Sequence, residues 1–181
     1  MRSTAMSWVL VAALAAVTAT PAGGTADRDG MALFEGRVID LREGWGEAEA
    51  CLVTDTNELA RCFRSEQELL SAIRTAEAST QSGLQEVAAA SACSSSLRLY
   101  DGTNYTGTVL YLSTRTTWIN LSSYGFSDKT SSFKVGACSV YLADLSNGGG
   151  DWYSTSATTA GKVAATMLSG WNNRISSVYI Q

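Results

Sequence analysis

One polar loop occurs twice in the second half of this chain, and this repeat restricts the fold more than any other feature of the sequence. Residues 124–136 read YGFSDKTSSFKVG, and residues 169–181, forty-five positions later, read SGWNNRISSVYIQ. Each copy has two consecutive serines between an aromatic residue and a segment of strand-forming residues. Self-similarity at a fixed period indicates a repeated supersecondary unit, so we expect two copies of one unit.

A second pattern precedes each polar loop. The first copy, YDGTNYTG, places Tyr100, Tyr105 and Gly107 in the spacing aromatic-x4-aromatic-x-Gly; the second, YLADLSNG, has Tyr141, Ser146 and Gly148 at the same offsets. Alternating apolar residues around turns rich in Gly, Asn and Asp predict β-hairpins. Residues 93–181 are therefore expected to form an all-β sandwich.

Charge divides the chain near position 90. Residues 27–90 carry thirteen acids against six arginines, whereas residues 91–181 carry four acids against six cations. Stretches of opposite net charge predict two structural units. Short strand-like segments and a capping box, Ser65 followed by Glu68, predict a small α+β region at 27–80 that is either an accessory region or a propeptide. Residues 81–92 are small and polar and predict a linker.

The first 26 residues predict a secretory signal peptide. One basic residue precedes an apolar stretch at 8–17, and small residues follow it. The mature protein is expected to be extracellular, monomeric and without a membrane segment. In an oxidising compartment an even number of cysteines indicates disulfides, and four cysteines allow three pairings. Cys51 and Cys62 flank a polar turn and are candidates for a local bridge, which leaves Cys93 with Cys138.

Histidine is absent from the chain, and this excludes several kinds of site. Neither a Ser-His-Asp nor a Cys-His nucleophile can form, nor can a zinc site based on histidine. A formal net charge of −4 supplies no basic patch for nucleic acid. Nothing in the sequence places two carboxylates of the second half together for glycoside hydrolysis. We therefore expect a binding protein and not an enzyme.

The two repeated patterns together resemble the βγ-crystallin-like domains. That family has the same hairpin signature and a calcium loop of the form (N/D)-(N/D)-x-x-(S/T)-S. NNRISS at 172–177 matches the loop at every position, and SDKTSS at 127–132 departs from it only at Ser127. The resemblance covers residues 97–181 and implies two Greek-key motifs in one sandwich. Among secreted bacterial members, the chain is similar to the Streptomyces-type metalloproteinase inhibitors.

The resemblance implies calcium as a ligand of the two loops. One site would use Asp128, the Lys129 carbonyl and the Ser131 hydroxyl. The other would use Asn173, the Arg174 carbonyl and the Ser176 hydroxyl, and Asn172 lies directly before Asn173. In the family, the two sites exchange ligands between loops and take a further carbonyl from the hairpin near Asp101. A single carboxylate predicts weak binding, on the order of 10⁻⁴–10⁻³ M. The alternative is a metal-free loop, because Asn and Ser also stabilise turns by hydrogen bonds to the backbone.

The segment NGGGDWYSTS presents Trp152 and Tyr153 beside a glycine-rich turn. Exposed aromatics on such a turn are candidates for binding a partner protein, and the alternative is a hairpin tip with one buried ring. The favoured function is inhibition of an extracellular metallopeptidase or other peptidase, as the resemblance implies. The alternatives are an extracellular calcium-binding structural or stress protein and an antifungal protein of the killer-toxin type.

Overall fold

The structure is a computed structural model that describes residues 28–81 and 97–181. The predicted signal peptide, Cys93 and the predicted linker beyond Gln81 lie outside these residues. The strands are β1 (Met31–Phe34), β2 (Arg37–Asp40), β3 (Ala50–Val53), β4 (Ala60–Phe63), β5 (Leu97–Tyr100), β6 (Val109–Leu112), β7 (Trp118–Asn120), β8 (Ser132–Lys134), β9 (Val140–Ala143), β10 (Val163–Ala164) and β11 (Ser177–Ile180). One α-helix, α1 (Glu66–Gln81), lies between β4 and β5.

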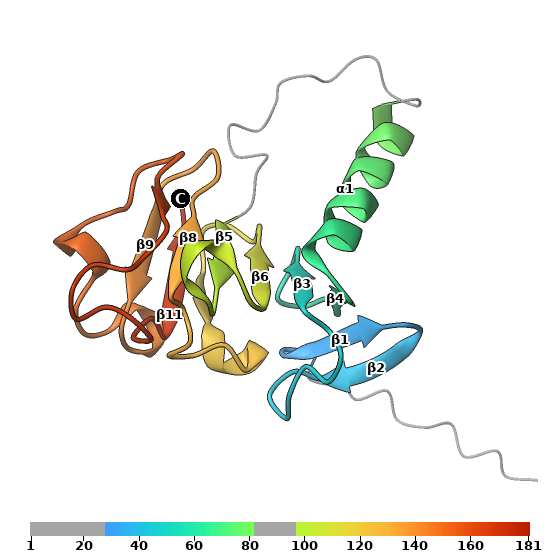
Figure 1. The fold of residues 1–181 in the computed structure, drawn as a ribbon, viewed down its shortest axis with the longest axis horizontal. Helices are drawn as coiled ribbons and strands as arrows, with labels where there is room; N and C mark the ends of the chain where they lie inside the picture. Colours follow the sequence, from blue (N-terminus) through green and yellow to red (C-terminus); the bar gives the residue numbers. More distant parts are fainter. Residues whose placement is uncertain (1–27, 82–96) are drawn as a thin grey trace, which may run out of the picture.

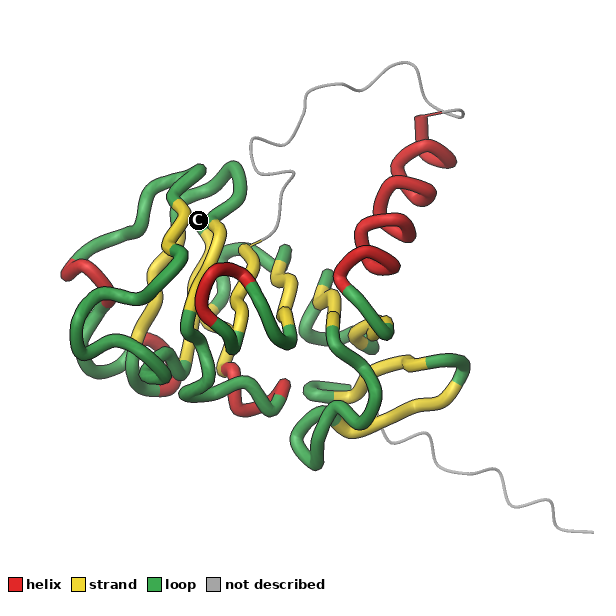
Figure 2. The backbone as a smooth tube through the Cα atoms, in the orientation of Figure 1, coloured by secondary structure: helices red, strands yellow, loops and turns green. Residues whose placement is uncertain are grey.

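Residues 97–181 contain only strands, loops and four short 3-10 helices (Figure 2), as an all-β unit requires. These helices are η1 (Thr103–Tyr105), η2 (Leu121–Tyr124), η3 (Ser146–Gly148) and η4 (Tyr153–Thr155). No helix in the described ranges is long and apolar enough to cross a membrane.

The described residues form two sheets, and each half of the repeat contributes strands to both. The larger sheet has the order β10-β8-β5-β6-β3-β4-β1-β2, and the smaller has the order β7-β11-β9. Strand β7 of the first half pairs with β11 of the second half, while β10 of the second half pairs with β8 of the first. The two halves are therefore interleaved.

The main core fills the space between the sheets. Alternate residues of each strand point to one face, so Leu97 and Leu99 of β5 are buried, as are Ile119 of β7 and Val178 of β11. All four belong to one hydrophobic cluster together with Phe133 of β8. The spacing of two between apolar residues thus accounts for the sandwich.

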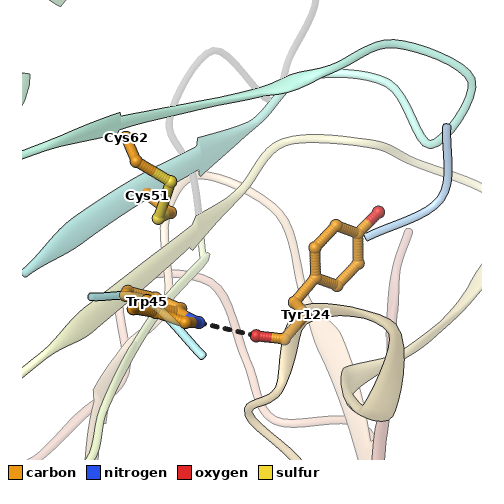
Figure 3. The surroundings of a disulfide bond; sticks show 4 residues. All are labelled: Trp45, Cys51, Cys62 and Tyr124. Carbon is orange, nitrogen blue, oxygen red and sulfur yellow. Dashed lines mark hydrogen bonds between the residues drawn. A yellow bond between two sulfur atoms is a disulfide. The ribbon is translucent and has the colours of Figure 1, made fainter. Parts of the chain in front are cut away.

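The N-terminal region continues the larger sheet. Strand β3 pairs in parallel with β6, from Ala50 opposite Val109 to Val53 opposite Leu112 (Figure 1). The Trp45 indole N–H donates a hydrogen bond of 2.8 Å to the carbonyl of Tyr124 (Figure 3). The acidic region and the repeated region differ in charge, but they share one sheet and one hydrophobic cluster.

Helix α1 begins at the predicted capping box. The Ser65 hydroxyl accepts the amide hydrogen of Glu68 at 3.2 Å, and the Glu68 carboxylate accepts the amide hydrogen of Arg64 at 3.1 Å. Leu69 is fully buried, and Leu70 and Ile73 pack around it, as the sequence predicts. The described side chains after Ile73 are exposed, so only the first turns of α1 pack on the sheet.

Glu66, the first residue of α1, joins the helix to the repeated region. Its Oε1 accepts a hydrogen bond of 2.7 Å from the Tyr100 hydroxyl and a second one from the Tyr111 hydroxyl. Burial raises the pKa of both tyrosines, and the hydrogen bonds to Glu66 raise it further, whereas the positive charge of Arg98 opposes part of the rise. Both phenols are therefore held in the neutral, donating form.

The predicted bridge between Cys51 and Cys62 is confirmed. The two residues lie directly opposite each other on β3 and β4, with 4.1 Å between their Cα atoms, and both are buried (Figure 3). Cys138 is also disulfide-bonded. Its predicted partner, Cys93, is outside the described ranges.

Candidate metal site

The two repeated loops lie against each other and form reciprocal backbone hydrogen bonds. The Asp128 amide donates to the Ile175 carbonyl at 2.9 Å, and the Asn173 amide donates to the Thr130 carbonyl at 3.0 Å. Asp128 and Asn173 occupy equivalent positions of the repeat, and so do Thr130 and Ile175. The two loops are therefore related by an approximate two-fold axis.

The side chains of the loops repeat this exchange. The Ser176 hydroxyl donates to Asp128 Oδ1 at 2.8 Å, and the Ser131 hydroxyl donates to Asn173 Oδ1 at 3.0 Å. The hydrogen bonds therefore pair Asp128 with Ser176 and Asn173 with Ser131, whereas the predicted ligand sets stay predictions. Each side-chain pair comes from two different loops, because the two-fold relation places the start of one loop beside the end of the other.

The backbone turns sharply at the first oxygen donor of each loop. Asp128 has φ 55° and Asn173 has φ 54°, in the left-handed region that Asp and Asn tolerate better than most residues. The carbonyls that follow them, at Lys129 and Arg174, accept no hydrogen bond from the described part of the chain. These two carbonyls are therefore available to a cation.

The last serine of each motif holds its loop to a hairpin. The Ser132 hydroxyl donates to the Gly102 carbonyl at 2.6 Å and accepts the Tyr105 amide hydrogen at 3.0 Å. The Ser177 hydroxyl forms the same two bonds, to the Leu145 carbonyl at 2.6 Å and from the Gly148 amide at 2.9 Å. Both serines are fully buried. They position the loop, and Ser131 and Ser176 remain as the candidate ligands.

The hairpins show that the predicted alignment of the second signature was wrong. In the first hairpin Asp101 Oδ1 accepts the Thr108 amide hydrogen, and in the second Asp144 Oδ1 accepts that of Asp151. The glycine before each donor has a positive φ, and a Cβ atom there would lie 2.0 Å or 1.9 Å from the carboxylate oxygen. The counterpart of Gly107 is therefore Gly150, two residues later than predicted.

The Arg174 side chain forms ion pairs with the second hairpin. Its Nη2 lies 2.6 Å from Asp144 Oδ2 and 2.7 Å from Asp151 Oδ2, and its guanidinium lies over the Trp171 ring at 4.9 Å. Hydrogen bonds to Asp151 and then Asp144 raise the pKa of Arg174 further. This cation is neutralised by two carboxylates, so it contributes little repulsion toward an ion at the loops.

The donors gathered here are those that calcium prefers. A carboxylate, an amide oxygen, two hydroxyls and two backbone carbonyls are hard oxygen ligands, as Ca²⁺ requires. Asp128, Lys129, Asn172 and Asn173 are exposed, so water can complete the coordination. Across 28–81 and 97–181, no three His, Cys, Asp or Glu side chains gather in one group. The donor set of the loops is therefore made of hard oxygen ligands, the kind that Ca²⁺ binds.

The structure separates the two candidate partner-binding aromatics. Tyr153 is buried with 4% of its surface exposed, and it packs edge-to-face on Phe133 and Trp171, so its prediction as a contact residue was wrong. Trp152 forms a bridge with Ala143, so the next residue along the extended chain points to the core. Trp152 itself is 38% exposed, and its indole N–H donates to the Gly148 carbonyl.

Trp152 belongs to an aromatic cluster on the outer face of the smaller sheet, which the sequence analysis missed. Its ring lies 4.9 Å from Tyr141 and 6.3 Å from Trp118, and Tyr179 packs against both of these. The sequence did contain a signal for this cluster, because in each strand an aromatic residue stands next to a buried aliphatic one. Trp118, Tyr141 and Tyr179 flank the buried Ile119, Leu142 and Val178.

No protein-family model matches this chain, and no curated protein matches it. Solved structures that resemble it are βγ-crystallin domains. The βγ-crystallin from Ciona intestinalis is 26% identical, with a TM-score of 0.40, and the match covers 48% of this chain and 99% of that one. A double mutant of a domain from Clostridium beijerinckii is 22% identical, with a TM-score of 0.39 and coverages of 48% and 97%. A domain from Flavobacterium johnsoniae is 21% identical, with a TM-score of 0.37 and coverages of 47% and 92%.

Proposed function

We propose that this chain is an extracellular calcium-binding protein, in which two loops of a βγ-crystallin-like unit hold two ions between them. The observation that carries the proposal is the reciprocal pairing of Asp128 with Ser176 and of Asn173 with Ser131. Two oxygens already lie about one hydrogen bond apart at each position. A calcium ion would replace each hydrogen bond with coordination by both oxygens and a loop carbonyl.

The strand exchange supports two interleaved Greek-key motifs as the scaffold. Strand β7 leaves the first half for the smaller sheet, and β10 leaves the second half for the larger one. The loops stand between these exchanged strands: Ser132 opens β8 and Ser177 opens β11. An ion that joins the loops would therefore connect both halves and both sheets, and we propose stabilisation of the secreted protein as its effect.

The two sites are expected to differ in affinity. The site at Asp128 has a carboxylate, whereas the site at Asn173 has a neutral amide in its place. Charge on the ligands sets much of the affinity for Ca²⁺, so the Asp128 site should fill first. Exposed loops with one carboxylate predict dissociation constants on the order of 10⁻⁴–10⁻³ M, in the range of extracellular calcium modules.

The test is calorimetric titration and thermal unfolding of the desalted full chain with calcium, with magnesium as the comparison. A ligand that binds only the folded state raises the melting temperature in proportion to ln(1 + [L]/Kd). We expect a saturable rise with millimolar calcium and a smaller one with magnesium. No heat and no shift up to about 10 mM calcium, well above the expected dissociation constants, would overturn the proposal.

Peptidase inhibition is the second candidate, and one observation favours it. The exposed part of Trp152 lines a groove of about 650 Å³ together with Leu168 and Trp171. An aromatic side chain beside a groove is typical of protein interfaces. Titration of a thermolysin-like metallopeptidase with the chain should slow hydrolysis of a peptide substrate, and Trp152→Ala should weaken that effect. Undiminished hydrolysis at a molar excess of the chain would remove this candidate.

A further inference from the structure

Two cations lie directly opposite each other on the outer face of the larger sheet. Arg98 of β5 pairs with Lys134 of β8 in the antiparallel register. Like charges in such a position destabilise a sheet, because their side chains stand about 5 Å apart at the Cβ atoms. Neither side chain forms an ion pair with any residue in the described ranges. Within this part of the chain, the repulsion is therefore not offset by a direct ion pair.

Aromatic rings hold both cations in place. The Arg98 guanidinium lies over the Tyr111 ring at 5.0 Å from the centroid. The Lys134 ammonium lies over Tyr105 at 4.2 Å and over Tyr100 at 5.3 Å. Cation–π contacts restrict both side chains. One guanidinium hydrogen bond of Arg98 goes to the Tyr100 hydroxyl, and the guanidinium and the ammonium have further N–H donors. Glu66 lies beside two of these tyrosines, and its carboxylate already accepts hydrogen bonds from the Tyr100 and Tyr111 hydroxyls.

The two cations line one side of a groove of about 600 Å³, which is a typical volume for a small-molecule site. Its other lining residues are Val135, Gly136, Ala137, Ala160, Gly161 and Val163. Two backbone hydrogen bonds of 2.8 Å hold the walls, from Val135 to the Lys162 carbonyl and from Gly161 to the Gly136 carbonyl. The small side chains leave room for a ligand to approach, and none of these described lining residues is Asp or Glu.

We propose that Arg98 and Lys134 form an oxyanion-binding site, which takes a small molecule with a carboxylate, sulfate or phosphate group. The planar guanidinium can donate two parallel hydrogen bonds to such a group, and the ammonium adds a compact positive charge. Binding would relieve the cross-strand repulsion, since the anion lies between the two cations. The groove shares no lining residue with the calcium loops.

The experiment measures binding of inorganic phosphate, sulfate and acetate by calorimetry and thermal unfolding, in calcium-free buffer held at an ionic strength of about 0.15 M with NaCl. We expect at least one of these anions to raise the melting temperature of the full chain saturably. Phosphate and sulfate without acetate would assign the site to tetrahedral oxyanions, whereas acetate would assign it to carboxylates. No saturable response to any of the three would overturn the proposal.

A charge-matched pair of variants separates the site from general screening. Arg98→Gln combined with Lys134→Gln should weaken anion binding by about tenfold or more, since two charge-assisted hydrogen bonds are lost. Arg37→Gln combined with Arg61→Gln removes the same charge from β2 and β4, at the other end of the sheet, and should bind like the original chain. Equal losses in both variants would overturn the proposal. If the first variant unfolds, Lys134→Gln alone serves, because it retains Arg98 and its contact with Tyr111.

Discussion

The Ser176 hydroxyl lies 2.8 Å from Asp128 Oδ1, although forty-eight residues separate the two in the chain. The equivalent pair, Ser131 and Asn173, lies at 3.0 Å. Both contacts arise because the two halves of the repeat are interleaved, so that each half completes the loop of the other. The binding of a ligand to these loops therefore depends on the relative position of the two halves, as well as on the residues of one motif.

Asp128→Asn should weaken calcium binding at the stronger site by about tenfold, which corresponds to about 1.4 kcal/mol. The substitution keeps an oxygen at the same position but removes the only carboxylate of the two loops. Calorimetric titration against the unaltered chain checks this. Glu58→Gln, an exposed site of equal charge change outside the loops, is the control. Unchanged affinity in Asp128→Asn would place the ion elsewhere.

Tyr111→Phe should lower the free energy of unfolding by about 1–2 kcal/mol, because it removes a buried hydrogen bond to Glu66. Urea unfolding followed by tryptophan fluorescence measures the change. Tyr179→Phe is the matched control, since its hydroxyl forms no hydrogen bond within the described residues. Equal effects of the two substitutions would mean that the Glu66 contact does not contribute to stability.

Stability should fall as the pH rises above about 10. Tyr100, Tyr111 and Tyr124 all have a pKa raised above the ordinary value of 10.0, mainly by burial. The unfolded chain then releases protons that the folded chain retains, so the stabilisation is complete below pH 10 and is lost above it. Urea unfolding between pH 8 and about pH 11, in the range where tyrosine ionises, should show a shallower decline in Tyr111→Phe. Parallel declines would contradict this account.

Thr130→Val should stabilise the protein by about 1 kcal/mol. The Thr130 hydroxyl is fully buried and has no hydrogen-bond partner among the residues that the structure describes, and the equivalent residue of the second loop is the apolar Ile175. An unpaired buried hydroxyl costs free energy that an isosteric methyl group avoids. Thermal unfolding compares this variant with Thr159→Val, an exposed site. A lower melting temperature for Thr130→Val would show that the hydroxyl has a partner in solution.

Gly150→Ala should destabilise the protein by several kcal/mol more than Gly170→Ala. Both glycines have a positive φ, which costs an alanine about 1 kcal/mol. At Gly150 the added Cβ would also lie 1.9 Å from Asp144 Oδ1, whereas at Gly170 no atom lies within 4 Å. Denaturant unfolding of both variants measures the difference. Similar losses would mean that the hairpin can shift to admit the side chain.

Local periodicity predicted much of this fold. The alternation of apolar residues predicted β5, β6, β8, β9 and β11 of the second half but not β7 or β10, and the capping box at Ser65 predicted the start of α1. The pairing of β3 with β6 was not predictable in this way, because parallel register between distant segments leaves no short-range pattern. The difference in net charge between residues 27–90 and 91–181 indicated two separate structural units. It describes the exposed faces, whereas the shared sheet depends on buried residues such as Cys51 and Leu110.

For the candidate site, the loop motif predicted the residues but not their partners. The spacing of Asp128 and Ser131 is local, whereas the two-fold relation between loops is a property of the complete sandwich. The second hairpin was misaligned for a related reason. Tyr141 and Gly148 satisfied a pattern of residue types, but the structure requires a glycine whose missing side chain makes room for the carboxylate of Asp144.

The parallel pairing of β3 with β6 has a consequence for any shortened form of the protein. Without residues 28–81, β6 would be an edge strand, and its N–H and C=O groups on that side would lack partners. All four of its residues, from Val109 to Leu112, are apolar and buried in the complete chain. Exposed apolar edges recruit strands from other molecules and promote aggregation. We therefore expect a chain without the acidic N-terminal region to self-associate, unless another strand pairs with β6.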